Sequence, residues 1–128
     1  MASGSTNTLE DNIINHFFRS GAVATGSTWL ALYSAAPGET GGGTELTGNG
    51  YARIAVTFNA PSAGVATNSN TLTFTAAGGA WSAIVGHGLT DASTAGNVLM
   101  YEDSVAGPTL ADGDSYEFGA ADITVTFT

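Results

Sequence analysis

The side chains that could carry chemistry in this sequence are two histidines and a small set of carboxylates. His16 and His87 are the only histidines in 128 residues, and neither has His, Asp or Glu at a spacing that forms a local metal site. The chain has no cysteine, which excludes thiolate catalysis and cysteine-based zinc sites. A Ser-His-Asp arrangement stays open, because its members are rarely adjacent, but there is no Gly-x-Ser-x-Gly elbow to favour one. We therefore expect structural histidines and predict that the protein is not an enzyme.

The carboxylates suggest calcium chemistry at one place only. Asp112-Gly-Asp114 with Glu117 offers oxygen ligands, but it lacks the full twelve-residue loop of an EF-hand. Asp-Gly is also good turn chemistry, so we predict a surface turn and keep a weak calcium site near Asp112–Asp114 as the alternative. Glu102 and Asp103 are adjacent at a predicted strand end, point to opposite faces and cannot act together on one bond. No cofactor and no metal is predicted.

A glycine-rich stretch, residues 38–50, could cradle a phosphate or form a flexible strap. A phosphate loop would follow a strand, open a helix and usually carry Lys, whereas this stretch leads into a strand and the chain has no lysine. Two interpretations remain, a flexible connection or an extended arm that orders only against another subunit. Arg53, which follows the stretch, can pair with a carboxylate of its own chain or of a neighbour.

The charge balance excludes several partners. Eleven acidic residues face two basic ones, giving a formal net charge of −9. Binding to nucleic acid or to anionic lipid relies on Lys and Arg, so we expect neither direct nucleic-acid binding nor membrane binding. The opening MASGSTNT is not a secretory signal, and no run approaches the ~18 apolar residues of a membrane span. We expect a soluble chain that is made in the cytoplasm.

The elements that must position these groups follow from apolar periodicity. Residues 7–20 have the period of an amphipathic helix, with Asn7 or Thr8 as its cap and Gly21 as its stop. The apolar stripe of this helix needs a partner surface, either its own sandwich or a neighbouring subunit. The stripe consists of Leu9, Ile13, Ile14, Phe17 and Phe18.

After residue 27 the apolar period changes to two, which indicates strands. Turn signals separate the predicted strands, as in an antiparallel sandwich or barrel. The sequence therefore predicts a mainly β fold: one domain over residues 1–128, a single antiparallel β-sandwich (jelly-roll-like) with one N-terminal α-helix and a glycine-rich arm at about 38–50. The predicted strands are residues 28–34, 51–58, 70–75, 81–90, 97–101, 116–118 and 123–127.

Four aromatic side chains on or beside these strands could form a platform for sugars. They are Trp29, Tyr33, Tyr51 and Trp81. Strand aromatics more commonly fill a sandwich core, so a carbohydrate-binding module is kept as an alternative only.

Three blocks of the sequence resemble a family of small tailed-phage virion proteins. They are the helix at 7–20, the segment WLALYSAAPGETGGGTEL from Trp29 to Leu46, and GYARIAVTF from Gly50 to Phe58. Members of the family carry Gln after the Arg, where this chain has Ile54. The likeness continues through residues 69–74, 80–89 and 91–101, and it covers nearly the whole chain.

The resemblance implies a non-enzymatic structural role in a bacteriophage virion. Such proteins are labelled tail-fibre or minor structural components, and the length and architecture are also similar to capsid cement, or decoration, proteins. Our first hypothesis is a cement protein on the outer surface of the capsid, which stabilises the head by binding the major capsid protein and copies of itself as a homotrimer. The alternative is a tail-fibre or tail-tip component that contacts the host surface, and only this alternative involves a host glycan.

The predicted protein-interaction residues lie on the helix, on the arm and in the block that follows it. They are Ile13, Ile14, Phe17, Phe18, Gly41, Gly42, Gly43, Glu45, Tyr51 and Arg53.

Overall fold

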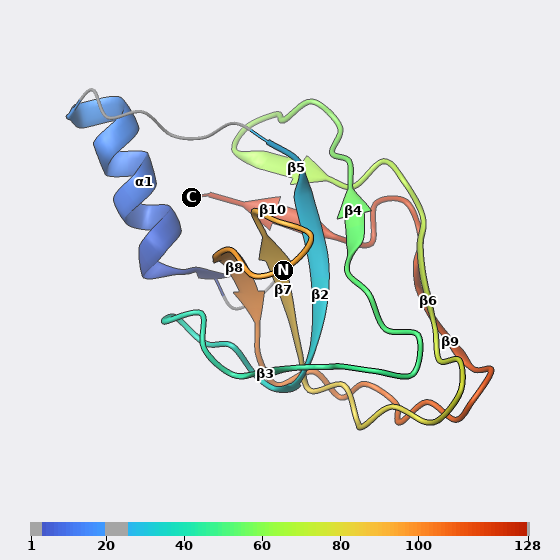
Figure 1. The fold of residues 1–128 in the computed structure, drawn as a ribbon. Helices are drawn as coiled ribbons and strands as arrows, with labels where there is room; N and C mark the ends of the chain where they lie inside the picture. Colours follow the sequence, from blue (N-terminus) through green and yellow to red (C-terminus); the bar gives the residue numbers. More distant parts are fainter. Residues whose placement is uncertain (1–3, 20–25, 128) are drawn as a thin grey trace.

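In a computed structural model that describes residues 4–19 and 26–127, the chain forms a β-sandwich with one helix at its N-terminal end (Figure 1). The larger sheet has the strand order β1-β8-β7-β2-β3, and β4 also pairs with β2. Every pair in this sheet is antiparallel. Its strands are β1 (Gly4–Ser5), β2 (Thr28–Ala35), β3 (Thr44–Glu45), β4 (Ile54–Val56), β7 (Gly86–Thr90) and β8 (Val98–Glu102).

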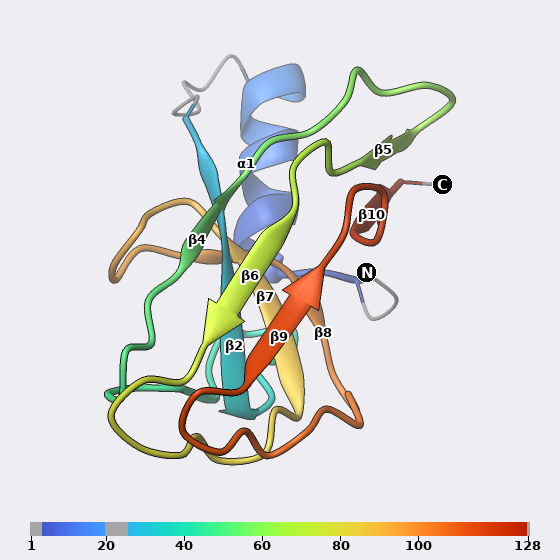
Figure 2. The same ribbon diagram turned by 90° about the vertical axis from the view of Figure 1, so that its right-hand side faces the viewer.

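The second layer consists of two antiparallel strand pairs. One joins β6 (Leu72–Thr75) to β9 (Ser115–Phe118), and the other joins β5 (Val65–Thr67) to β10 (Thr124–Thr126). In Figure 2, β6 and β9 lie in front of β2, β7 and β8, which shows the two layers face to face. The predicted class, a mainly β antiparallel sandwich with an N-terminal helix, is confirmed.

The core between the layers comes from strands that alternate buried and exposed residues. Leu72 and Phe74 of β6 are buried while the threonines beside them are exposed. Leu30 and Leu32 of β2 are buried opposite them in the same cluster. Removing this apolar surface from water supplies the main driving force for the sandwich.

Two predicted strands, 51–58 and 81–90, are at most half as long in the structure as the sequence pattern suggests. The segment 51–58 forms only β4, because Tyr51 closes a turn with Gly48 and packs its ring against Trp81 in the core. The segment 81–90 forms only β7, because the backbone N–H groups of Trp81 and Ile84 donate to the loop carbonyls of Leu110 and Pro108 and not to a neighbouring strand. The short strands β1, β3 and β5 were not predicted.

The predicted helix is present as α1 (Asn7–Phe18). Its N-cap is Thr6, so the prediction of Asn7 or Thr8 as the cap is wrong by one or two positions. The predicted stop at Gly21 lies outside the described residues. No helix within the described ranges is long and apolar enough to cross a membrane.

Candidate functional site

The apolar stripe of α1 is covered only near its first turn. Leu9 packs against the sandwich core, and Ile13 is half-buried. The exposed fraction is 51% at Ile14, 72% at Phe17 and 81% at Phe18. Large exposed apolar patches are one mark of interaction surfaces, and the docking role of this helix end stays a prediction. The four predicted helix residues therefore lie toward the uncovered end of one stripe.

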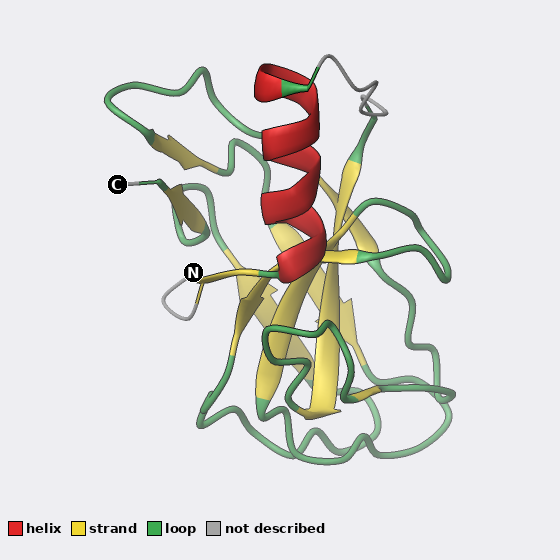
Figure 3. Ribbon diagram, turned by 90° about the vertical axis from the view of Figure 1, so that its left-hand side faces the viewer, coloured by secondary structure: helices red, strands yellow, loops and turns green. Residues whose placement is uncertain are grey.

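Thr6 explains why only the first turn is held. Its Oγ1 accepts a hydrogen bond from the backbone N–H of Leu9 at 3.4 Å and donates to the carbonyl of Val98 at 2.6 Å. Next to it, the N–H of Asn7 donates to the carbonyl of Glu39 at 3.1 Å. The helix is thus fixed to β8 at its start, and its later turns rise beside the sheet (Figure 3).

The predicted arm lies against its own chain in this structure. The N–H of Gly38 donates to Oδ1 of Asp103 at 3.3 Å, and the N–H of Gly41 donates to the carbonyl of Gly38 at 3.1 Å. Gly43 has φ +81°, and a Cβ there would overlap the carbonyl oxygen of Ala35. The glycines therefore permit a tight turn on β2 and are not extended into solvent. A docking role for residues 41–43 stays a prediction.

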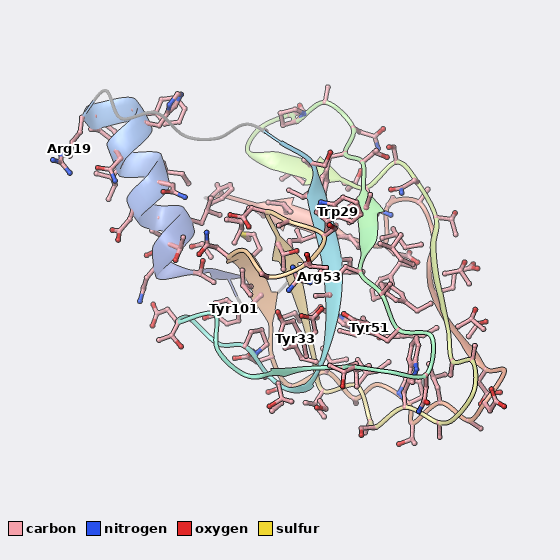
Figure 4. The ribbon with its side chains drawn as sticks, in the orientation of Figure 1. Arg19, Trp29, Tyr33, Tyr51, Arg53 and Tyr101 are labelled. Carbon is pink, nitrogen blue, oxygen red and sulfur yellow. The ribbon has the colours of Figure 1, made fainter. Side chains whose placement is uncertain are left out.

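The other three predicted interaction residues meet in one network inside the chain. Arg53 makes two hydrogen bonds to Glu45, from Nε to Oε1 and from Nη2 to Oε2, both at 2.8 Å. The hydroxyl of Tyr51 donates to Oε1 of Glu45 at 2.7 Å and accepts from the N–H of Leu32 at 3.0 Å. In Figure 4 the side chains of Tyr33, Tyr51 and Arg53 gather around β2.

The remaining guanidinium nitrogen of Arg53 fixes the loop between β7 and β8. Its Nη1 donates to Oγ1 of Thr90 at 3.2 Å and to the carbonyls of Ala92 and Ala95 at 2.7 and 2.8 Å. The arginine side chain is only 8% exposed. Arg53 therefore pairs with a carboxylate of its own chain, one of the two options that the sequence left open.

The electrostatics of this pair follow from burial opposed by hydrogen bonding. Burial alone would raise the pKa of Glu45, but the hydrogen bonds from Arg53 and Tyr51 outweigh it and hold that pKa below its ordinary value. Burial raises the pKa of the Tyr51 hydroxyl. The carboxylate is thus kept ionised and the phenol neutral, which keeps the network in one hydrogen-bonding state.

The aromatic side chains proposed for sugar binding do not form an exposed platform. Trp81 is 3% exposed and Tyr33 is 4% exposed, so both are core residues. Trp29 and Tyr51 are half-buried, and the Tyr51 ring packs edge-to-face on Trp81 with 5.6 Å between ring centroids. Trp81 and Tyr33 thus have the core role that is more common for aromatic residues on strands.

Sequence reasoning missed a polar cluster around His87. Its Nδ1 lies 3.1 Å from Oε2 of Glu102, and its Nε2 lies 2.9 Å from the hydroxyl of Tyr116. Burial lowers the pKa of His87, and Glu102 partly opposes this effect. The partners come from β8 and β9, so no local spacing could reveal them. The period-two pattern was the available signal, because it places His87 on the same inward face as Leu89.

This cluster borders a cleft of about 300 Å³ between the layers. The cleft is lined on one side by His87 and Glu102, and on the other by Phe118 and by the segment that enters β10. His16, by contrast, is exposed on α1, where its ring packs edge-to-face on Phe17.

The acidic turn at 111–114 uses its carboxylates as backbone acceptors. Oδ1 of Asp112 accepts from the N–H of Gly78 at 2.8 Å, and Oδ2 of Asp114 accepts from the N–H of Ala111 at 3.1 Å. These contacts fit the turn interpretation. Across residues 4–19 and 26–127, no group of three or more His, Asp or Glu side chains is arranged to hold a metal ion.

Comparison with protein families identifies the family of this chain. A family model described as "Podophage GP4 fiber I protein gp80" matches residues 4–126. No curated protein matches the chain. The family match spans the helix, both layers of the sandwich and the Glu45–Tyr51–Arg53 network.

Proposed function

Since the chain belongs to the family of the podophage GP4 fiber I protein gp80, and is therefore a phage virion structural protein, we propose that it is a fibre component that attaches to another virion chain through α1. The observation that carries this proposal is the uncovered helix end, with Phe17 and Phe18 largely exposed. The fibre assignment, in preference to capsid cement, rests on the wording of the family description.

The helix has the geometry of a docking element. An amphipathic helix binds by laying its apolar face into a groove of the partner, with anchors spaced three and four residues apart. Ile14, Phe17 and Phe18 have this spacing. Full burial of each phenylalanine would contribute about 1.5–3 kcal/mol before the costs of association. The first turn is already fixed by Thr6, so little ordering is required on binding.

We propose that the role needs no catalysis. The polar groups of Glu45, Tyr51 and Arg53 are bonded to one another and to their own chain. Both ring nitrogens of His87 are likewise within hydrogen-bond distance of their own chain. Because these polar groups are bonded within the chain, the proposal gives them a structural role and not a catalytic one.

Association with further copies, as a homotrimer, is part of the proposal. Several copies around one axis would present several helices to the virion and gain avidity without any single strong contact. Sedimentation of the purified chain tests this point, and a monomer at all concentrations would remove the trimer.

The capsid cement interpretation is the second candidate, with the major capsid protein as the partner. It uses the same exposed helix, which would add buried area across seams between shell subunits. Gold-labelled antibody against the chain separates the candidates on micrographs of intact virions. Label on fibres or the tail supports the fibre proposal, whereas label distributed over the head would replace it with the cement interpretation.

A variant tests the role of α1 under either candidate. Phe17→Asp should sharply reduce the amount of the chain recovered on purified virions while the purified protein stays folded. Val65→Asp is the matched control, because Val65 is an exposed apolar residue on β5. Equal incorporation of Phe17→Asp and wild type would reject the docking helix.

A further inference from the structure

An apolar hollow lies at the base of α1, between the helix and the strands. Its volume is about 230 Å³. Leu9 of α1, Leu99 and Met100 of β8 and Val125 of β10 belong to its lining, which is apolar apart from Thr28. Water in such a hollow finds few hydrogen-bond partners, whereas an apolar cavity of about 150 Å³ binds benzene. The occupant that fits this hollow is therefore an apolar side chain, and one phenyl ring has the right size.

The exposed end of α1 cannot fill this hollow in its own chain. Leu9 lines the hollow near the start of the helix, and Phe18 comes nine residues later, about 14 Å further along the axis. Nine residues also make about two and a half turns, so Phe18 lies on the side of the helix away from Leu9. In Figure 1 the last turn of α1 lies away from the strands. The Phe18 side chain, which is 81% exposed, is therefore placed to contact another chain.

The charges near the hollow and near Phe18 have opposite signs. Glu10 and Asp11 are exposed near the start of α1, where the hollow lies. Arg19 follows Phe18 and is exposed as well, whereas Arg53, the second arginine of the chain, is buried. Each copy thus carries an apolar ring beside a positive charge and an apolar hollow beside negative charges. A second copy complements the first in both shape and charge, although each copy has a net charge of −9.

We propose that the hollow at the base of α1 binds the Phe18 ring of a second copy of this chain, with Arg19 of that copy beside Glu10 and Asp11. This inference rests on the proposed function and deepens it, since it names a copy of the chain as the partner of α1. Two different surfaces meet in the contact, so it either closes a ring of copies or extends a row of them. A ring of three copies is the proposed homotrimer, and a row would join one trimer to the next.

Sedimentation of the purified full chain measures this association. At about 500 μM most of the chain is associated if the Kd is about 50 μM. Phe18→Ser should raise the Kd at least about thirtyfold, the usual effect of truncating an aromatic anchor of an interface. Val65→Ser is the matched control and should leave the Kd unchanged, because Val65 is exposed on β5 and points away from Ala66, which lines the hollow. A wild-type chain that stays monomeric at about 500 μM, or an unchanged Kd in Phe18→Ser, would overturn the proposal.

A second variant blocks the hollow and leaves the helix end intact. Ala66→Phe places a ring in the hollow of its own chain, so this variant should also lose the association. An equimolar mixture of Ala66→Phe and Phe18→Ser should associate again, because the first variant supplies the ring and the second supplies the open hollow. A mixture that fails to associate, while both variants keep the circular dichroism spectrum of the wild type, would reject the contact. Ala66→Leu takes the place of Ala66→Phe if the larger side chain prevents folding.

Failure of this inference is distinguishable from failure of the proposed function, because sedimentation needs no virion. If the wild-type chain is monomeric but Phe17→Asp still lowers the amount recovered on virions, α1 binds a different virion chain. That result overturns the contact between copies and leaves the proposed function in place. If the chain associates through Phe18 while Phe17→Asp is incorporated normally, the contact between copies stands and the docking of α1 on the virion is rejected.

Discussion

The neighbourhood of Arg53 and the end of α1 were both predicted to contact other chains, and they differ in how far their own chain satisfies them. Arg53 is almost fully buried, and each of its guanidinium nitrogens donates to its own chain. Phe17 and Phe18 are mostly exposed and contribute little to the core. One region is thus satisfied within its own chain, while the other leaves apolar surface exposed.

The largest expected change in stability comes from removing the guanidinium group of Arg53. Arg53→Met should lower the free energy of unfolding by about 3 kcal/mol, because it leaves Glu45 partly buried without its partner. Urea unfolding measures the change. Arg19→Met, an exposed arginine on the helix side, is the matched control and should stay within about 0.5 kcal/mol of wild type. Equal losses of stability at the two arginines would contradict the difference between the buried Arg53 network and the exposed end of the helix.

The next largest change in stability is expected at Thr6, which joins α1 to β8. Thr6→Val should lower the free energy of unfolding by about 1–2 kcal/mol, since it removes the cap of α1 and leaves the carbonyl of Val98 without its hydroxyl donor. Circular dichroism should show a loss of helix together with the lower midpoint. Retention of both the helix signal and the midpoint would show that the helix is held in another way.

A smaller effect distinguishes the two histidines by pH. Burial lowers the pKa of His87 below the ordinary value of about 6.5, so the unfolded chain binds this proton more readily than the folded chain. The free energy of unfolding should therefore fall as pH drops below about 6.5 and keep falling until the folded pKa is reached. His87→Gln should flatten this part of the pH profile, and His16→Gln, on the exposed helix, serves as the control. An unchanged profile in His87→Gln would assign the pH dependence to other groups.

The smallest effect on stability belongs to the exposed end of α1. Phe17→Ser should change the free energy of unfolding by no more than about 0.5 kcal/mol, because a largely exposed side chain gains little from folding. A loss above about 2 kcal/mol in thermal or urea unfolding would show that Phe17 belongs to the core of the isolated chain.

Burial could be predicted from the sequence where apolar residues recur with a single period along a segment. The alternation in β6 identified Leu72 and Phe74 as buried, and the helical stripe identified the apolar face of α1. The cap was misplaced because Thr6 is chosen by its contact with Val98, 92 positions away. Tyr51 broke the predicted alternation because a turn at Gly48 sends its ring into the core.

The candidate sites were harder to predict than the strands, because they depend on contacts between residues far apart in the sequence. Composition and pattern could nominate Glu45, Tyr51 and Arg53 but could not tell an internal ion pair from an external one, since both use the same residues. His87, Glu102 and Tyr116 stand far apart in sequence and meet only because β7, β8 and β9 converge on one side of the sandwich. Long-range pairing of strands has no local signature, which is why the cleft was missed.

The attachment of α1 at its first turn also has a mechanical consequence. The twelve residues of α1 form a rod about 18 Å long that is held at one end, where Thr6 bonds to β8. A force on the free end of α1 therefore acts on the buried hydroxyl of Thr6 and on the two-residue pairing between β1 and β8. Under load this hinge should yield before the sandwich does, so α1 would swing away from β8 while the β-layers stay intact.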